Sequence, residues 1–340
     1  MTGTRMTVLL TGASGVIGRA VAKELRDCHV IGQAHSELDV PEADEVLRAD
    51  LAQPLLGLPE PTWNDLARRV QAVIHSGALT VWGQPYERYQ EINVAGTRRV
   101  VELARKAQAP IHLISTCFVR TLELGTQHTL SPGNVVEPYI RSKLEAERLV
   151  ADSGLPYSVF RPTNLVGDSR TGASSRPQIV QLMSEWFCRG KAPYFPAHPG
   201  NLVDVVSLDV TAIAVARAVE MGAVGGPYWI TSGADAMTVA QTQAILLDHA
   251  RESGREIDAV PVVDPREPLP IPLDDIPATS RGFLKVLIDV SEVTSACGGV
   301  LPSSLKELRG RFGVPEVNDR DAFRLSLNYW AEQRALARSR

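Results

Sequence analysis

The sequence predicts an α/β protein: a Rossmann-type doubly wound parallel sheet with a smaller C-terminal substrate lobe. Over the first half of the chain, short apolar runs alternate with helical patterns, which is the order expected of βαβ units. The glycine-rich segment Thr11–Gly18 directly follows the first apolar run and opens a helical pattern, as in folds that bind dinucleotides. With 340 residues, the chain is long enough for one large domain that carries a lobe.

The expected elements follow one another along the chain. Strands are expected at Thr7–Leu10, His29–Gly32, Ala72–His75, Ile111–Ser115 and Tyr157–Phe160, with a further strand ending at Asp50. Helices are expected near Val16–Arg26, Tyr86–Ala107, Tyr139–Ser153, Leu208–Met221, Val239–Glu252 and Arg320–Ala337. We therefore assign residues 1–165 to the Rossmann domain and 166–340 to a substrate lobe with C-terminal helices. This assignment allows parts of residues 166–340 to return to the sheet of the first domain.

Composition excludes several classes of function. A formal net charge of −4 argues against nucleic-acid binding, which needs concentrated Lys and Arg. No apolar run reaches the roughly 20 residues of a membrane span, and no signal peptide is evident. The cysteines and histidines are scattered without metal-ligand spacing, so we expect no metal, no disulfide framework and a cytoplasmic location. The four cysteines are Cys28, Cys117, Cys188 and Cys297.

The glycine-rich segment is expected to hold a dinucleotide pyrophosphate. Gly12 permits the tight turn, Gly15 lets the backbone approach the phosphates, and Gly18 allows the helix to pack closely on the strand. The start of the helix adds amide donors and the positive end of its dipole. We therefore expect cofactor contacts from Gly12, Ser14, Gly15, Val16, Ile17 and Gly18.

The end of the second strand predicts a preference for NADP(H). NAD-specific sites usually place an acidic residue there for the ribose 2′-hydroxyl, but this strand continues into His35 and Ser36, and Glu37 comes too late. Neither His35 nor Ser36 repels a 2′-phosphate, and both can donate to it. NAD(H) stays an alternative because the usual Arg is also absent. Asp50 and Leu51 are expected near the adenine.

Tyr139 and Lys143 are the expected catalytic pair. Four residues apart on a helix, they lie on one face. A nearby ammonium typically lowers the pKa of a phenol by about 1–3 units, so Tyr139 is expected to exchange a proton with a carbonyl oxygen and Lys143 to hold the nicotinamide ribose. Thr116, at the carboxyl end of a strand, is expected to bind the same oxygen, with Ser115 as the fallback. Cys117 is interpreted as a small buried residue.

These segments together resemble the extended short-chain dehydrogenases/reductases. The markers, in order, are TGASGVIG, IHSGA, NVAGT, STCFV and YIRSK. Within that group, RPTNLVGDSRTG and LVDVVSLDVTA are most similar to the thioester reductases and fatty acyl-CoA reductases, the male-sterility-like branch. The resemblance implies cofactor contacts from Ser76, Gly77, Ala78, Pro162 and Thr163, and it implies that Asn93 supports the catalytic architecture beside the cofactor. Three departures are the HSGA form of the fourth-strand motif, the missing Arg after the second strand, and the missing tyrosine-glycine pair of sugar epimerases.

The favoured function is therefore NADPH-dependent reduction of an acyl thioester, bound to a carrier protein or to coenzyme A, to an aldehyde or alcohol. Reduction of a free aldehyde or ketone is the nearest alternative. The others are an epimerase or dehydratase that retains NAD, and a non-catalytic protein that senses NADP. An aromatic group in the lobe suits an acyl chain or a ring, although it is equally typical of a core: Trp186, Phe187, Tyr194 and Phe195. A homodimer through the helices near 86–107 and 139–153 is left open.

Overall fold

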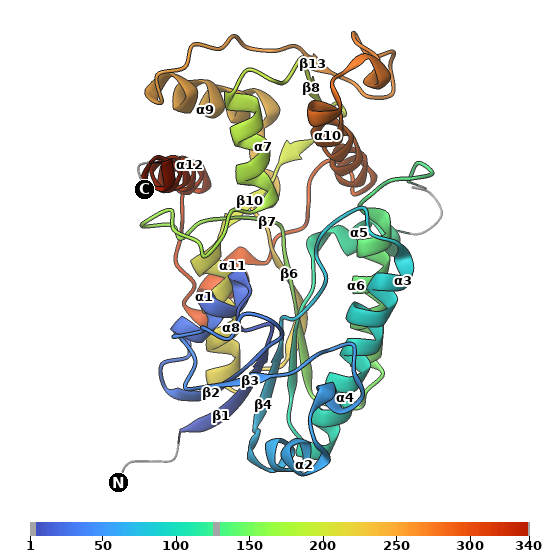
Figure 1. The fold of residues 1–340 in the computed structure, drawn as a ribbon, viewed down its shortest axis with the longest axis vertical. Helices are drawn as coiled ribbons and strands as arrows, with labels where there is room; N and C mark the ends of the chain where they lie inside the picture. The colour runs from blue at the N-terminus through green and yellow to red at the C-terminus, as the bar shows by residue number, and fades with distance from the viewer. Residues whose placement is uncertain (1–4, 125–129, 339–340) are drawn as a thin grey trace.

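The computed structural model describes residues 5–124 and 130–338. Within these residues, the main sheet has seven parallel strands in the order β11-β6-β5-β4-β1-β2-β3 (Figure 1). They are β1 (Met6–Thr11), β2 (Cys28–Ala34), β3 (Glu45–Arg48), β4 (Ala72–His75), β5 (Ile111–Ile114), β6 (Tyr157–Pro162) and β11 (Gly225–Ile230). The strand order reverses between β1 and β4, which is where ligands bind in open α/β sheets.

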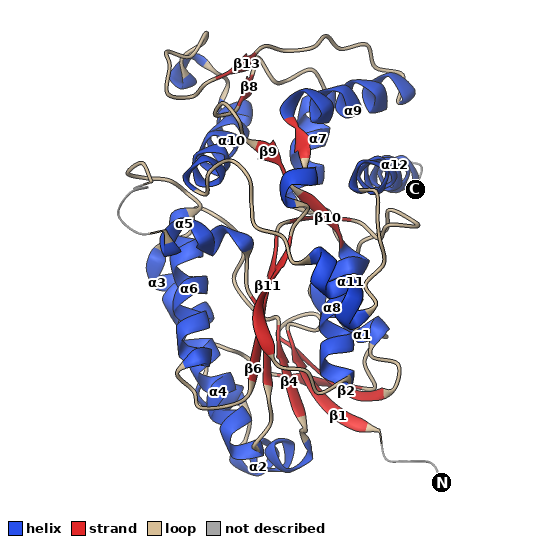
Figure 2. Ribbon diagram, turned by 180° about the vertical axis from the view of Figure 1, so that it is seen from behind, coloured by secondary structure: helices blue, strands red, loops and turns tan. Residues whose placement is uncertain are grey.

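Helices cover both faces of the sheet, as Figure 2 shows from behind. One face carries α1 (Val16–Glu24), α8 (Leu208–Glu220) and α11 (Leu305–Phe312), and the other carries α2 (Glu60–Arg69), α4 (Ala95–Ala107) and α6 (Glu137–Ala151). The predicted doubly wound Rossmann class is therefore confirmed. No helix within the described ranges combines the length and the apolar character that a membrane crossing requires.

The chain crosses back to the sheet well after residue 165. Strand β11 pairs in parallel with β6, and α8 packs on α1. The sequence pattern did not predict β11, because Gly225, Gly226 and Pro227 at its start are typical of a turn. It also missed α2, α11 and two helices of the lobe, and it merged three elements into one helix over 86–107. These are α3 (Tyr86–Tyr89), a π-helical turn at Gln90–Val94, and α4.

The lobe has its own hydrophobic core, which contains the aromatic group noted above. Its helices are α7 (Ile179–Cys188), α9 (Val239–Glu252), α10 (Ala278–Ala296) and α12 (Asp319–Arg338). Its short strands are β7 (Asn164–Val166), β8 (Phe195–Pro196), β9 (Leu202–Val203), β10 (Val205–Ser207), β12 (Met237–Thr238) and β13 (Val262–Val263). Helix α9 starts with a capping box between Thr238 and Gln241, which satisfies amides that a helix start leaves unpaired.

His112 makes the fold sensitive to acid. It lies in β5, its side chain is 1% exposed, and its Nδ1 has no partner among the described residues. Burial lowers the pKa of His112 to about 4, from 6.5. Between these values the unfolded chain binds a proton that the folded chain does not, so stability falls as the pH falls. We expect His112→Leu to remove about 2–3 kcal/mol of this loss between pH 7 and pH 4.5, measured by urea unfolding. Equal losses in both proteins would contradict this.

Candidate functional site

The glycine-rich turn forms a cradle that side chains would fill. Gly12 has a φ of +67°, and a Cβ there would lie 2.6 Å from the Cα of Gly77. A Cβ on Gly18 would collide with the carbonyl oxygen of Gly12. Helix α1 follows from Gly15 without a side-chain cap, so its first amides are left to another partner. The cradle and the uncapped helix start fit a dinucleotide pyrophosphate.

One cation from the lobe lies beside this turn. A guanidinium nitrogen of Arg176, in the exposed segment before α7, lies 3.9 Å from the position of a Cβ on Gly15. Ser174 and Gln178 both donate side-chain hydrogen bonds to the carbonyl oxygen of Arg176, each at 3.2 Å. Arg176 could not be predicted from the sequence, because it lies outside every cofactor motif.

A buried hydrogen-bond chain joins the turn to the neighbouring strand and helix. His75 ring nitrogens lie 2.7 Å from the Thr11 hydroxyl and 2.9 Å from the Thr97 hydroxyl. Thr97 donates to the carbonyl oxygen of Asn93 at 2.5 Å, and Thr11 accepts from the amide of Gly77 at 3.1 Å. Burial lowers the pKa of His75 to about 3, so His75 is a neutral link. The sequence shows His75 only as part of the IHSGA motif, because its partners Thr11 and Thr97 are distant in sequence.

Of the residues expected at the adenosine end, His35 and Asp50 lie close together after β2 and β3. Exposed His35, directly after β2, lies 3.9 Å from the Asp50 carboxylate. Asp50 also accepts from the Ala52 amide at 2.8 Å, so it caps its own loop. Glu37 points to Arg19 of α1, at 2.8 Å. Ser36 is exposed, whereas Leu51 is buried beneath Gly77 and Gly96.

Thr116, Tyr139 and Lys143 come together at the carboxyl end of β5. Lys143 donates to the carbonyl oxygen of Ile114 at 2.7 Å, and burial lowers the pKa of its ammonium to about 8. The expected fall in the pKa of Tyr139 is wrong for this structure. Burial raises the pKa of Tyr139 well above its usual value, and a hydrogen bond from Thr116 opposes this only in part.

Asn93 connects the loop after β4 with α6, the helix that carries the expected catalytic pair. It lies in the π-helical turn, donates to the Ser142 hydroxyl at 2.9 Å, and bonds both backbone groups of Leu79 at 2.7 and 3.1 Å. Ser142 in turn donates to the carbonyl oxygen of Tyr139 at 2.7 Å. Asn93 therefore joins the first turns of α6 to the loop after β4.

The remaining expected residues surround the same edge of the sheet. Ser76, Gly77 and Ala78 follow β4 and are partly exposed, and Pro162 and Thr163 lie buried at the end of β6. Ser115, the fallback residue, is buried and its hydroxyl oxygen has no partner among the described residues. Cys117 is fully buried, and burial raises the pKa of its thiol, which suits a packing residue.

A cavity of about 980 Å³, which includes the solvent at its mouth, opens beside these residues. Phe118 and Thr163 line it near the sheet, and Trp186, Phe187 and Phe195 line it in the lobe. Tyr194 of the aromatic group is instead buried in the core, and it donates to the carbonyl oxygen of Ile271 at 3.1 Å. Most of the lining is apolar. Asp204 is an exception, and burial raises the pKa of its carboxyl to about 7.

The two segments that resemble those of the reductases, RPTNLVGDSRTG and LVDVVSLDVTA, are hydrogen-bonded to each other. Asp209, at the start of α8, accepts from the amide and the hydroxyl of Ser169 at 2.9 and 2.6 Å. Asp168 accepts from the amides of Arg170 and Thr171, each at 3.0 Å. The two segments thus form one structural unit between the sheet and the lobe.

Comparison with known proteins gives a family and distant relatives. Residues 21–215 match the family model described as male sterility protein. The chain is 29% identical to a linear gramicidin synthase component of Brevibacillus parabrevis over 54% of this chain. It is 27% identical to a polyketide synthase-nonribosomal peptide synthetase of Phaeosphaeria nodorum over 75% of this chain. The matches span only 4% and 7% of those two proteins.

Solved structures with lower identity share the fold. The terminal R domain of the myxalamid PKS-NRPS pathway matches with a TM-score of 0.72 and 24% identity, over 98% of this chain and 92% of that one. UDP-glucuronic acid 4-epimerase of Bacillus cereus matches with a TM-score of 0.65 and 16% identity, over 96% of this chain and 99% of that one.

Proposed function

Because the chain belongs to the male sterility protein family of extended short-chain dehydrogenases/reductases, we propose that it is an NADPH-dependent reductase of acyl thioesters. The observation that carries this is the Thr116–Tyr139–Lys143 set beside a largely apolar cavity. The acyl group is held on a carrier protein or on coenzyme A, and the product is an aldehyde or alcohol. The similarity to peptide and polyketide synthetases suits such a substrate.

The residues act on the carbonyl oxygen of the substrate. Bound NADPH supplies the hydride for the carbonyl carbon. Thr116 and Tyr139 donate hydrogen bonds to the oxygen as negative charge develops on it, and such donors are typically worth about 3 kcal/mol of the barrier. Tyr139 gives its proton to this oxygen as the hydride arrives, which forms a neutral thiohemiacetal, and solvent then restores the proton on Tyr139. Breaking the carbon–sulfur bond gives the aldehyde, and the hydroxyl proton of the thiohemiacetal passes to the departing thiolate. Formation of the alcohol takes a second hydride from a second NADPH. Lys143, buried and cationic below about pH 8, favours the negative charge near Tyr139.

The cavity favours an apolar acyl chain. It runs from Phe118, two residues after Thr116, to Phe195 and Leu246 in the lobe. Each methylene buried there contributes about 0.8 kcal/mol. The kcat/KM of straight-chain acyl substrates should therefore rise with chain length until the cavity is filled.

We expect Ser36→Asp to shift the preference from NADPH towards NADH. Exposed Ser36 follows β2, and a carboxylate there repels a 2′-phosphate while accepting from the 2′-hydroxyl of NADH. The ratio of the two dissociation constants, measured by fluorescence titration, should change at least about tenfold, which is about 1.4 kcal/mol. A wild-type protein that already prefers NADH would contradict the proposed cofactor preference.

We expect Arg176→Ala to weaken both dinucleotides equally. Its guanidinium lies over the glycine-rich turn, where the pyrophosphate common to NADPH and NADH is proposed to bind. A charge-assisted hydrogen bond is worth about 1.5–3 kcal/mol, so both dissociation constants should rise about tenfold or more. Arg170→Ala, an exposed Arg in the same loop, is the matched control. Weakening of NADPH alone would place Arg176 at the 2′-phosphate instead.

The experiment that tests the function is consumption of NADPH with acyl-pantetheine thioesters and with the matching aldehydes. Release of free thiol in proportion to NADPH consumed supports thioester reduction. Consumption with aldehydes alone would make the protein a carbonyl reductase. No consumption with either would favour an NAD-retaining epimerase or an NADP-sensing protein.

A further inference from the structure

The helix that carries Tyr139 is capped by a side chain outside it. Helix α6 begins at Glu137, so Tyr139 is its third residue. The side-chain oxygen of Asn134 accepts from the amides of Val136 and Glu137, at 2.9 and 3.3 Å. Asn134 therefore satisfies amides that a helix start leaves unpaired, and its placement fixes the first turn of α6.

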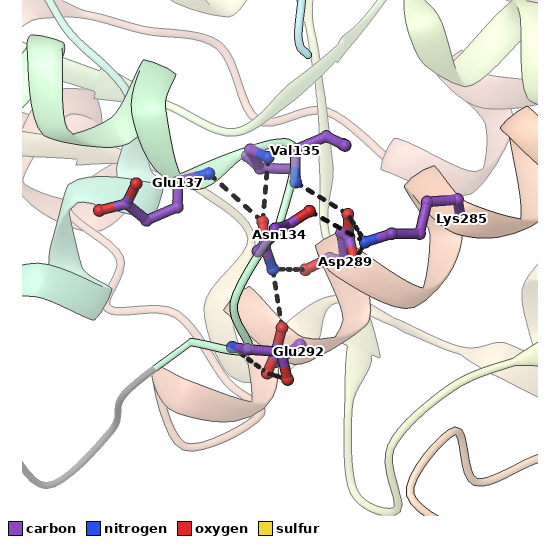
Figure 3. Close-up of polar contacts among 9 residues, drawn as sticks. Asn134, Val135, Glu137, Lys285, Asp289 and Glu292 are labelled. Atoms are coloured by element: carbon purple, nitrogen blue, oxygen red, sulfur yellow. Dashed lines mark hydrogen bonds and ion pairs between the residues drawn. The ribbon is translucent and has the colours of Figure 1, made fainter. Parts of the chain in front are cut away.

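Helix α10, from the last third of the chain, holds Asn134 in place (Figure 3). The Asn134 Nδ2 donates to the carbonyl oxygen of Asp289 at 3.2 Å and to the carboxylate of Glu292 at 2.8 Å. The Asp289 carboxylate accepts from the amide of Val135 at 2.9 Å and from Lys285 at 2.5 Å. We call these contacts of Asn134 and Val135 with Asp289 and Glu292 the clamp. Asn134 is 4% exposed and Asp289 is 2% exposed, so their part of the clamp is shielded from water, whereas Glu292 and Lys285 are partly exposed.

The clamp is polar and directional, and it is buried at Asn134 and Asp289. Apolar packing would hold two segments together, but it tolerates small shifts that hydrogen bonds to fixed acceptors do not. Ser131 adds to the clamp, because its amide and hydroxyl donate to Glu292 at 2.7 and 2.5 Å. The segment before α6 is thus fixed at several atoms to two carboxylates of one helix.

The same helix forms a wall of the cavity. Leu287, Val290, Ser291 and Thr294 of α10 line it. Helix α10 also meets the segment after the other catalytic hydroxyl, because Thr121 in α5 (Arg120–Glu123) donates to the carbonyl oxygen of Val293 at 3.1 Å. One helix therefore contacts the cavity, the segment after Thr116 and the start of α6.

We propose that Asn134 is a positioning residue for Tyr139. Asp289 and Glu292 hold Asn134, so that the Tyr139 phenol keeps a fixed position relative to the acyl cavity. This inference rests on the proposed role of Tyr139. A displacement of a reacting group by about 1 Å can lower a rate about 100-fold. Loss of the clamp should therefore lower kcat more than it raises KM.

The test exchanges the donor and the acceptor of the clamp. Asn134→Asp keeps an oxygen to cap α6, but it places a carboxylate against Glu292. We expect kcat to fall about tenfold or more, with the NADPH dissociation constant unchanged and faster hydrogen exchange in peptides covering residues 131–145. Adding Glu292→Gln supplies an amide donor to the new carboxylate and should restore most of kcat. Glu137→Gln, which changes a carboxylate paired with Arg141, is the matched control.

A kcat for Asn134→Asp within about twofold of the wild-type value, which is under about 0.5 kcal/mol, would overturn the proposal. So would a loss that Glu292→Gln leaves unchanged, because capping or stability alone would then explain it. Tyr139→Phe, measured alongside with the substrate that the protein reduces, separates the two proposals. Full turnover in that variant removes Tyr139 as proton donor, whereas the exchange rates report on the clamp without any turnover.

Discussion

Tyr139→Phe should lower kcat about 100- to 10,000-fold, the range typical for loss of a positioned proton donor. The variant keeps the ring in its buried place against Tyr89, whose ring centre lies 6.2 Å away, and it removes only the hydroxyl. We therefore expect the dissociation constant of NADPH and the thermal midpoint to change little. Single-turnover consumption of NADPH with a saturating acyl thioester is the measurement.

Tyr89→Phe is the matched control for this result. It removes a buried phenol in α3 that donates to the carbonyl oxygen of Val81 at 2.5 Å, whereas Tyr139 lies in α6. We expect a loss of about 1 kcal/mol in stability and nearly full turnover. Equal turnover in the two variants would assign the proton to another group, with Thr116 the first candidate because it is hydrogen-bonded to Tyr139.

Arg161→Met should lower the free energy of unfolding by about 3–5 kcal/mol, since it leaves a buried carboxylate unpaired. Arg161 is 3% exposed and lies between two carboxylates. It donates to Glu147 at 3.0 Å and to Glu123 at 3.0 Å, and its guanidinium lies 4.5 Å from the centre of the Trp229 ring. Urea unfolding at pH 7 is the measurement.

Two further variants identify the cause of that loss. Adding Glu147→Gln to Arg161→Met removes the buried charge and should restore part of the stability. Arg217→Ala breaks an exposed pair with Glu220 and should cost less than about 1 kcal/mol. A loss that the second substitution leaves unchanged would show that packing of the Arg161 stem matters more than charge.

The sequence was sufficient to predict the parallel sheet around the proposed cofactor turn. Thr11–Gly18 lies between a strand and a helix, so its proposed function depends on adjacent residues. The parallel arrangement of the strands follows from the alternation of strands and helices. It was insufficient for β11, whose glycines and proline are typical of a turn. That strand forms because the edge of β6 offers backbone partners to Gly225 and, after an irregularity in the register, to Tyr228, Trp229 and Ile230.

In the candidate site, too, the sequence predicted some features and the tertiary structure decided others. The spacing of Tyr139 and Lys143 places both on one helix face, and the end of β5 places Thr116 beside them. The direction of the pKa shift of Tyr139 was wrong, because spacing says nothing about burial. In the tertiary structure, burial outweighs the hydrogen bond from Thr116.

By itself, the sequence determined the Rossmann class, and it predicted the proposed cofactor turn and the proposed reacting side chains, because each depends on residues a few positions apart. Only the tertiary structure decided which distant residues serve them. His75 joins Thr11 to Thr97, and helix α10 holds Asn134 from more than 150 positions away. Such contacts depend on how helices and strands pack in three dimensions, and local periodicity carries no record of that packing.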